Sequence, residues 1–134
     1  MLLVDASVWV ALERPQDRYH AEARSLVRDF KRPLAALDLT LYEVANAAVV
    51  KIGQPERGLY LSELVLSRCR DRLIRIDAEL LASAIGIASE HGITAYDAAY
   101  VAAARRNGWT LVSADIRDLV SRGLAVAPDA ADYP

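Results

Sequence analysis

The sequence is poor in the residues that hold many small secreted proteins together and that bind many transition metals. Its 134 residues include one cysteine, Cys69, and two histidines, His20 and His91. A single cysteine excludes an internal disulfide and a cysteine-rich zinc site. We therefore expect Cys69 to be a buried thiol and the protein to reside in the reducing cytoplasm.

Long apolar runs are also missing. No run approaches the ~18 residues of a membrane-spanning helix, and Asp5 interrupts the place where the apolar core of a signal peptide would lie. We expect neither a membrane segment nor a cleaved leader. Apolar residues nevertheless make up 54% of the chain, enough to form a core at this length. One domain is expected over residues 1–134, with a loose tail at 128–134.

An excess of positive charge is missing as well. Sixteen lysines and arginines stand against 18 acidic residues, which gives a formal net charge of −2. Overall charge therefore does not favour nucleic-acid binding, and any such partner must be held by local cations or through a metal. Several arginines could supply such local cations, although exposure to solvent is the simpler explanation for each of them. The candidate phosphate contacts are Arg14, Arg18, Arg68, Arg70, Arg72, Arg75, Arg105 and Arg106.

What the sequence does contain is a regular alternation of short apolar segments and helical patterns. Strands are predicted at 2–4, 34–37, 73–76, 110–112 and 124–126. Helices are predicted at 6–12, 17–30, 40–52, 55–69, 78–91, 94–106 and 116–122. This order indicates an α/β fold, in which helices cover both faces of a mainly parallel sheet.

Four acidic residues fall where such a sheet would bring them together. Asp5 directly follows the first predicted strand, and Asp115 comes three residues after the strand at 110–112. Glu43 and Asp97 are predicted in the first turns of their helices. Because open α/β sheets bind ligands beyond the carboxyl ends of their strands, the four carboxylates are expected to share one crevice.

Each acid alone has a simpler structural explanation. The segments that end at Glu43 and Asp97 match the capping-box pattern, Thr-x-x-acid, and Asp5 and Asp115 suit helix N-caps. Apolar neighbours weaken this explanation for Asp5 and Asp97, because an unpaired carboxylate is costly to bury. A divalent cation would remove both the burial cost and the mutual repulsion. Carboxylate ligands suit Mg²⁺ or Mn²⁺, and such a centre is suited to phosphodiester hydrolysis.

Four segments around these acids resemble the acidic motifs of the PIN-domain family, and most closely those of its VapC toxins. They read VDASVWVAL, YEVANA, TAYDAAYVA and LVSAD, in the family's order and over essentially the whole chain. The resemblance implies a Rossmann-like three-layer α/β/α sandwich with a short, mainly parallel central sheet. It also implies an endoribonuclease dependent on Mg²⁺, for which Mn²⁺ substitutes, an RNA substrate, a cognate VapB-type antitoxin and a homodimer.

The resemblance assigns roles to the four acids. Asp5, Asp97 and Asp115 would be direct or water-mediated metal ligands. Glu43 would hold the metal or orient the attacking water. In addition, Trp9, Tyr96 and Tyr100 could stack on bases, although packing in the core is the simpler role for an aromatic side chain.

Secondary candidates lie beside the acids. Ser7 and Ser113 would bond to the acids or to the scissile phosphate, or would only cap local backbone. Asn46, one helical turn beyond the second acid, would support the metal site. Asp118 resembles an additional acid of some members and, one turn beyond Asp115, could face the same cleft. An exposed surface acid is the alternative for Asp118.

The sequence leaves three other functions open. Phosphoryl transfer through Asp5 would need a second acid nearby and a lysine, but Ser7 takes the near position and both lysines, Lys31 and Lys51, lie outside the acidic motifs. A domain that binds RNA or protein without cutting is disfavoured by the presence of all four acids. An RNA-processing nuclease outside a toxin system would share the same chemistry, and the residues do not separate it from a toxin.

Overall fold

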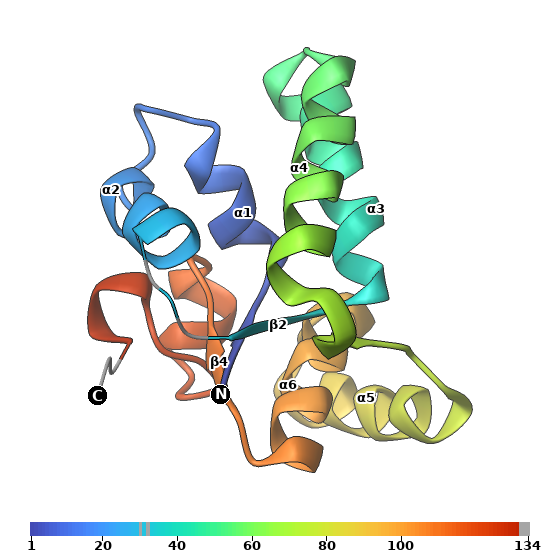
Figure 1. Cartoon of the computed structure of the whole chain (residues 1–134). Helices are drawn as coiled ribbons and strands as arrows, with labels where there is room; N and C mark the ends of the chain where they lie inside the picture. The colour runs from blue at the N-terminus through green and yellow to red at the C-terminus, as the bar shows by residue number, and fades with distance from the viewer. Residues whose placement is uncertain (30, 32, 132–134) are drawn as a thin grey trace.

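A computed structural model of the chain describes residues 1–29, 31 and 33–131. Its centre is a parallel sheet with the strand order β3-β2-β1-β4 (Figure 1). The strands are β1 (Leu2–Val4), β2 (Leu34–Leu37), β3 (Leu73–Ile74) and β4 (Thr110–Val112). The predictions at 2–4, 34–37 and 110–112 are thereby confirmed, and β3 is shorter than predicted.

The predicted strand at 124–126 was wrong as a strand, because only one residue of it pairs. Val126 forms an isolated parallel bridge with Val112. A turn through Gly123, with a φ of 71°, sends the chain back to the sheet edge. The amide of Val126 also donates to the carbonyl of Leu111 at 2.9 Å.

Helices follow each strand as the sequence predicts. They are α1 (Ala6–Leu12), α2 (His20–Arg24), α3 (Asp38–Ala47), α4 (Pro55–Cys69), α5 (Ala78–His91) and α6 (Ala95–Asn107). Wider π-type turns extend two of them, at Ser25–Asp29 and Ala48–Ile52, and form the short element Ile116–Val120; single 3-10 turns lie at Arg70–Arg72 and Pro128–Ala130. Phe30, the last residue of one predicted helix, and residues 132–134 of the predicted tail lie outside the described residues.

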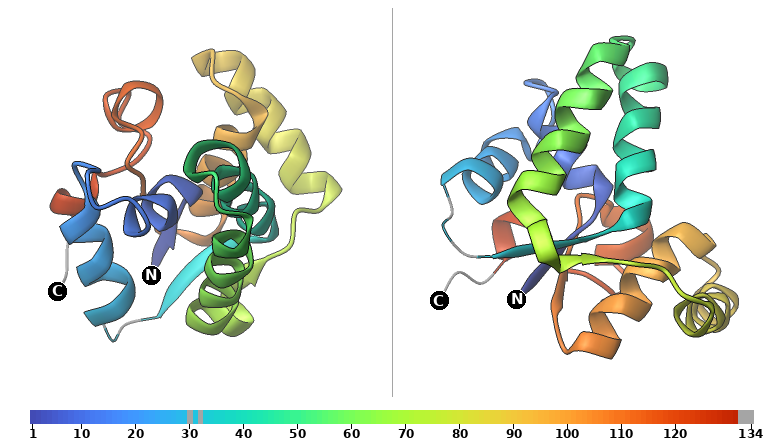
Figure 2. Two further views of the ribbon diagram at one scale, coloured as in Figure 1. Left: turned by 90° about the horizontal axis from the view of Figure 1, so that it is seen from above. Right: turned by 45° about the vertical axis from the view of Figure 1, so that its right-hand side comes forward.

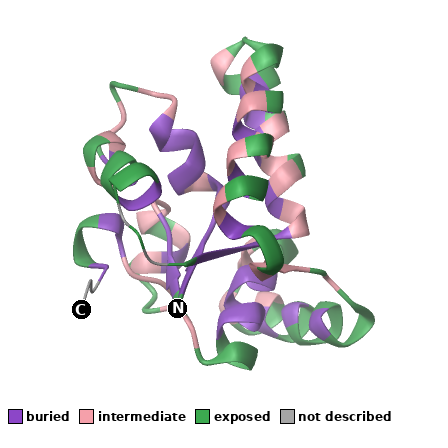
Figure 3. Cartoon of the chain, in the orientation of Figure 1, coloured by how far each residue is buried: buried purple, intermediate pink, exposed green. Residues whose placement is uncertain are grey.

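The core has two halves, one on each face of the sheet. Alternate strand side chains separate them: Leu2 and Val4 join the half under α1, α2 and α4, whereas Leu3 joins the half under α5 and α6. Figure 2 shows the helices on the two sides of the strands, and Figure 3 shows burial concentrated along the sheet and the inner helix faces. Helices on both faces of a parallel sheet confirm the predicted three-layer α/β/α sandwich.

Two further predictions concern the cysteine and membrane-spanning segments. Cys69 is buried at the end of α4, and burial raises the pKa of its thiol to about 12. The predicted buried thiol is confirmed. Within the described residues, none of the helices combines the length and the apolar character needed to cross a bilayer.

Candidate active site

A cavity of about 400 Å³ opens at the carboxyl ends of the strands, and all four predicted acids line it. Asp5 stands at the end of β1, and its backbone amide donates to the carbonyl of Val112, the last residue of β4. The neighbouring strand ends thus place the segments after β1 and β4 side by side. Helices α3 and α6 supply Glu43 and Asp97 from the other side.

Asp5 is the most buried of the four acids, with 4% of its surface exposed. It is the N-cap of α1, where its carboxylate accepts from the Ser7 amide at 3.0 Å and also from the Ser7 hydroxyl. Burial raises the pKa of Asp5 to about 7; hydrogen bonds from Ser113 and Ser7 oppose the rise, and the nearby acids add to it. The capping role is confirmed, but it leaves this carboxylate short of compensating positive charge.

Two serines join the segment after β1 to the segment after β4. The Ser7 hydroxyl, which donates to Asp5, accepts from the amide of Ala114 at 2.8 Å. Ser113 is fully buried, and its hydroxyl accepts from the amide of Asp115 at 3.0 Å. The two hydroxyl oxygens are 3.4 Å apart. Both serines therefore cap local backbone and hydrogen-bond to Asp5. The predicted contact with the scissile phosphate stays a prediction.

Glu43 is half-buried, and its place in the helix differs from the prediction. Helix α3 begins at Asp38, two residues earlier than predicted, so Glu43 lies in its second turn. The capping box was therefore wrong for this acid: Thr40 instead accepts from the amide of Leu37. Glu43 accepts from the Tyr100 hydroxyl at 2.7 Å. Its pKa is raised, mainly by burial and then by Asp97, while Tyr100 opposes the rise.

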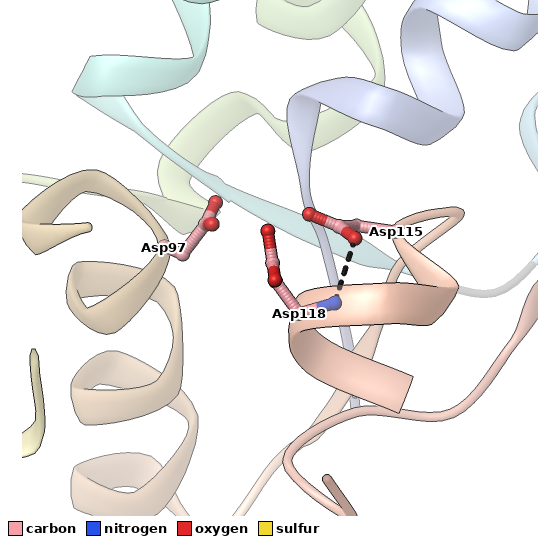
Figure 4. Close-up of side chains that lie close together, drawn as sticks. All are labelled: Asp97, Asp115 and Asp118. Carbon is pink, nitrogen blue, oxygen red and sulfur yellow. Dashed lines mark hydrogen bonds between the residues drawn. The ribbon is translucent and has the colours of Figure 1, made fainter. Parts of the chain in front are cut away.

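Asp97, Asp115 and Asp118 form a compact group of carboxylates. One oxygen of each lies within 4.8 Å of the other two (Figure 4). The N-cap of α6 is Thr94, whose side chain accepts from the amide of Asp97. Burial raises the pKa of Asp97, and Asp115 and Asp118 raise it further. Asp118 thus lies beside two acids that line the cavity, although it is not among the lining residues itself, and its place in the cleft stays a prediction.

The Asp115 carboxylate also has a structural role. It caps the turn at Ile116–Val120 by accepting from the amide of Asp118 at 3.0 Å, the dashed contact of Figure 4. Asp118 itself pairs with Arg117 at 3.4 Å and approaches Arg122 at 3.9 Å. These arginines offset part of the negative charge of Asp118.

Two cations, Arg14 and Lys51, line the same cavity. Arg14 was among the predicted phosphate contacts. Lys51 was missed because it lies outside every acidic motif, although it follows Glu43 by eight residues, close to two helical turns, and so falls on the same helix face. Lys51 lowers the pKa of Glu43. Asn46, one turn beyond Glu43, also lines the cavity, as predicted.

The other predicted phosphate contacts do not gather at the acids. Arg68 donates to the carbonyl of Val27, in the segment Ser25–Asp29, and Arg72 donates to that of Leu34, in β2, so both link neighbouring elements of the fold. Arg105 and Arg106 line a separate cavity of about 340 Å³ between α5 and α6. Helix α6 carries them away from Asp97, which lies in its first turn.

The aromatic candidates separate into two kinds. Trp9 and Tyr100 are fully buried, so packing in the core is confirmed for both. Tyr100 is nevertheless among the residues that line the cavity, and its hydroxyl donates to Glu43. Tyr96, next to Asp97, is 62% exposed and so is available to a ligand.

Comparisons with known proteins agree with this geometry. Residues 2–121 match the PIN domain. Ribonuclease VapC3 of Pyrobaculum aerophilum is 36% identical over 119 residues, which cover 85% of this chain and 88% of that protein.

Solved structures share the fold. VapC20 of Mycobacterium tuberculosis, a toxin that cleaves the sarcin–ricin loop, aligns with a TM-score of 0.78 at 20% identity, over 92% of this chain and 95% of its own. A chain of a toxin–antitoxin complex from Klebsiella pneumoniae aligns with a TM-score of 0.72 at 20% identity, over 96% of this chain and 98% of its own. The match to the domain and the similarity to VapC3 together show that the chain belongs to the PIN-domain family.

Proposed function

We propose that this chain is a metal-dependent endoribonuclease and the toxin of a VapBC-type toxin–antitoxin pair. The observation that carries the proposal is the convergence of Asp5, Glu43, Asp97 and Asp115 on one cavity at the carboxyl end of the sheet. The similarity to Ribonuclease VapC3 supports RNA as the substrate. The like charges of this cavity would repel an RNA backbone unless a cation lay between them.

The carboxylates fit a hard divalent cation. Asp97, Asp115 and Asp118 offer oxygens close enough to share one ion, and oxygen ligands suit Mg²⁺, with Mn²⁺ as a substitute. Asp5 and Glu43 would complete the site directly or through water. Bound there, the metal would supply positive charge at a phosphodiester oxygen and lower the pKa of a coordinated water.

The surrounding residues would prepare the site for RNA. Ser7 and Ser113 fix the two strand ends that carry Asp5 and Asp115. Arg14 and Lys51, at the cavity wall, would hold phosphates next to the scissile one, because cations there offset the negative charge of the acids. Glu43 would orient the attacking water. The water oxygen would bond to phosphorus and release a proton to solvent, while the bond between phosphorus and the leaving ribose oxygen would break and that oxygen would take up a proton from solvent.

The antitoxin and the dimer belong to the same proposal. Structures with this fold include a toxin–antitoxin complex, which supports a VapB-type antitoxin as partner; a homodimer is proposed with it. Cytoplasmic location is also proposed, since a lone buried thiol suits a reducing compartment. An RNA-processing nuclease is the alternative, and growth arrest that a neighbouring gene product relieves would separate the two.

The test is cleavage of total cellular RNA by purified, antitoxin-free protein in Mg²⁺ or Mn²⁺. Asp97→Asn protein, purified identically, runs beside it, with a chelator lane for each. Discrete fragments from the unsubstituted protein alone, abolished by chelation, are expected. Fragments from both proteins would indicate a contaminant. No fragments from folded protein in either metal would favour a PIN domain that binds without cutting.

A further inference from the structure

A chain of three hydrogen bonds runs from the end of β2 through the core to Glu43. The amide of Leu37 donates to the Thr40 hydroxyl oxygen at 3.1 Å. The Thr40 and Tyr100 hydroxyls are 2.8 Å apart. The Tyr100 hydroxyl lies 2.7 Å from Oε1 of Glu43 and donates to it. The contacts join β2, α3 and α6, and the last two of these elements line the cavity.

The direction of this chain is fixed by its two ends. The Leu37 amide can only donate, so Thr40 accepts there. Tyr100 has one hydroxyl proton, and it goes to the Glu43 carboxylate, which can only accept while ionised. The Thr40 proton must therefore point to the Tyr100 oxygen. Every donor in the chain then points toward Glu43.

Burial leaves these hydroxyls few other partners. Thr40 is fully buried and Tyr100 is 1% exposed, and a buried hydroxyl without a partner is costly. The Tyr100 ring packs in the core half under α5 and α6, so it cannot follow a moving side chain. Glu43, by contrast, has three rotatable bonds and is only half-buried. The rigid partner thus determines where the flexible carboxylate lies.

We propose that Tyr100 is a positioning residue, with Thr40 behind it, that holds the Glu43 carboxylate in place for a divalent cation. The inference rests on the proposed function, whose acidic site it deepens. Neither hydroxyl needs to touch the substrate. Partners of this kind typically alter metal affinity by about 10- to 100-fold when they are removed.

The experiment measures Mn²⁺ binding to metal-free protein by calorimetry, separately from RNA cleavage. Tyr100→Phe removes one hydroxyl and keeps the ring, and it should weaken Mn²⁺ binding about tenfold. Thr40→Val should weaken binding less, and Thr40→Ser, which retains the hydroxyl, should restore it. Tyr60→Phe is the matched control, because its hydroxyl accepts from Arg28 away from the cavity. It should leave Mn²⁺ binding unchanged.

A double-mutant comparison separates positioning from general damage. If Tyr100 acts only through Glu43, Tyr100→Phe should have no further effect on Mn²⁺ binding in Glu43→Gln protein. Circular dichroism confirms that each variant is folded. Unchanged Mn²⁺ binding in Tyr100→Phe, a full additive loss in the double variant, or no Mn²⁺ binding by the unsubstituted protein would overturn the inference. Mn²⁺ binding without RNA cleavage by the unsubstituted protein would instead overturn the proposed function alone.

Discussion

Asparagine in place of Asp5 should stabilise the metal-free protein at neutral and alkaline pH. Folding raises the pKa of Asp5 from 3.8 to about 7, so the folded protein keeps a proton that the unfolded chain releases. The free energy of unfolding is therefore unaffected by Asp5 below pH 3.8, falls as the pH rises because the folded state holds its proton more tightly, and reaches its lowest value above about pH 7. Asparagine does not titrate, and it caps a helix as well as aspartate does, so it should still accept from the Ser7 amide.

The size of the effect follows from the pKa. A change in pKa from 3.8 to about 7 lowers the free energy of unfolding by roughly 4 kcal/mol once Asp5 is fully ionised. Each tenfold change in proton affinity is worth about 1.36 kcal/mol. This is an upper limit, because the unfolded chain and local relaxation reduce it. Even about 1 kcal/mol would raise the melting temperature by roughly 3–5 °C at this chain length.

The assay is thermal and urea denaturation with chelator, in steps from pH 4 to pH 9. The gain from Asp5→Asn should be absent near pH 4 and grow toward pH 8. Asp77→Asn is the matched control: Asp77 is also an N-cap, but its pKa is lowered, chiefly by the hydrogen bond from the Leu80 amide, so asparagine should bring no gain. Identical pH profiles for Asp5→Asn and the unsubstituted protein would refute the reasoning.

Three further predictions concern other parts of the molecule. Arg14→Ala and Lys51→Ala should each weaken binding of non-cleaved RNA and reduce the slope of log affinity against log salt by about 1, while Arg75→Ala should not; equal slopes would exclude phosphate contacts. Asp118→Asn should weaken Mn²⁺ binding by roughly tenfold in calorimetry, and an unchanged affinity would exclude it from the metal site. Cys69 should react with a thiol reagent only after unfolding, because burial raises its pKa to about 12; rapid labelling of the native protein would contradict this.

Much of the fold could be predicted because local pattern and tertiary structure agree. The apolar strand 34–37 and the helix that begins at Pro55 appear where the sequence places them. Each has a strong local signal: an apolar run in the first case, proline in the first turn in the second. Asp5 was predicted to be buried because apolar residues flank it on both sides, and it is.

The remaining details depend on contacts between distant residues. The start of α3 was misplaced because Thr40 looked like an N-cap, whereas its hydroxyl is committed to Leu37 and to Tyr100, 60 residues away. Lys51 went unnoticed for a similar reason: only the helix places it at the cavity. No local pattern separates Arg72, which donates to a distant carbonyl, from an arginine free to bind phosphate.

The pairing of β1 with β4 sets the moment in synthesis at which activity can begin. Asp5 is among the first residues made, yet the hydroxyl of Ser7 accepts from the amide of Ala114, which is made 107 residues later. Until the ribosome has released that segment, a nascent chain has neither its last paired strand nor Asp115. The acidic site of this chain therefore cannot be assembled before synthesis has reached the last fifth of the sequence.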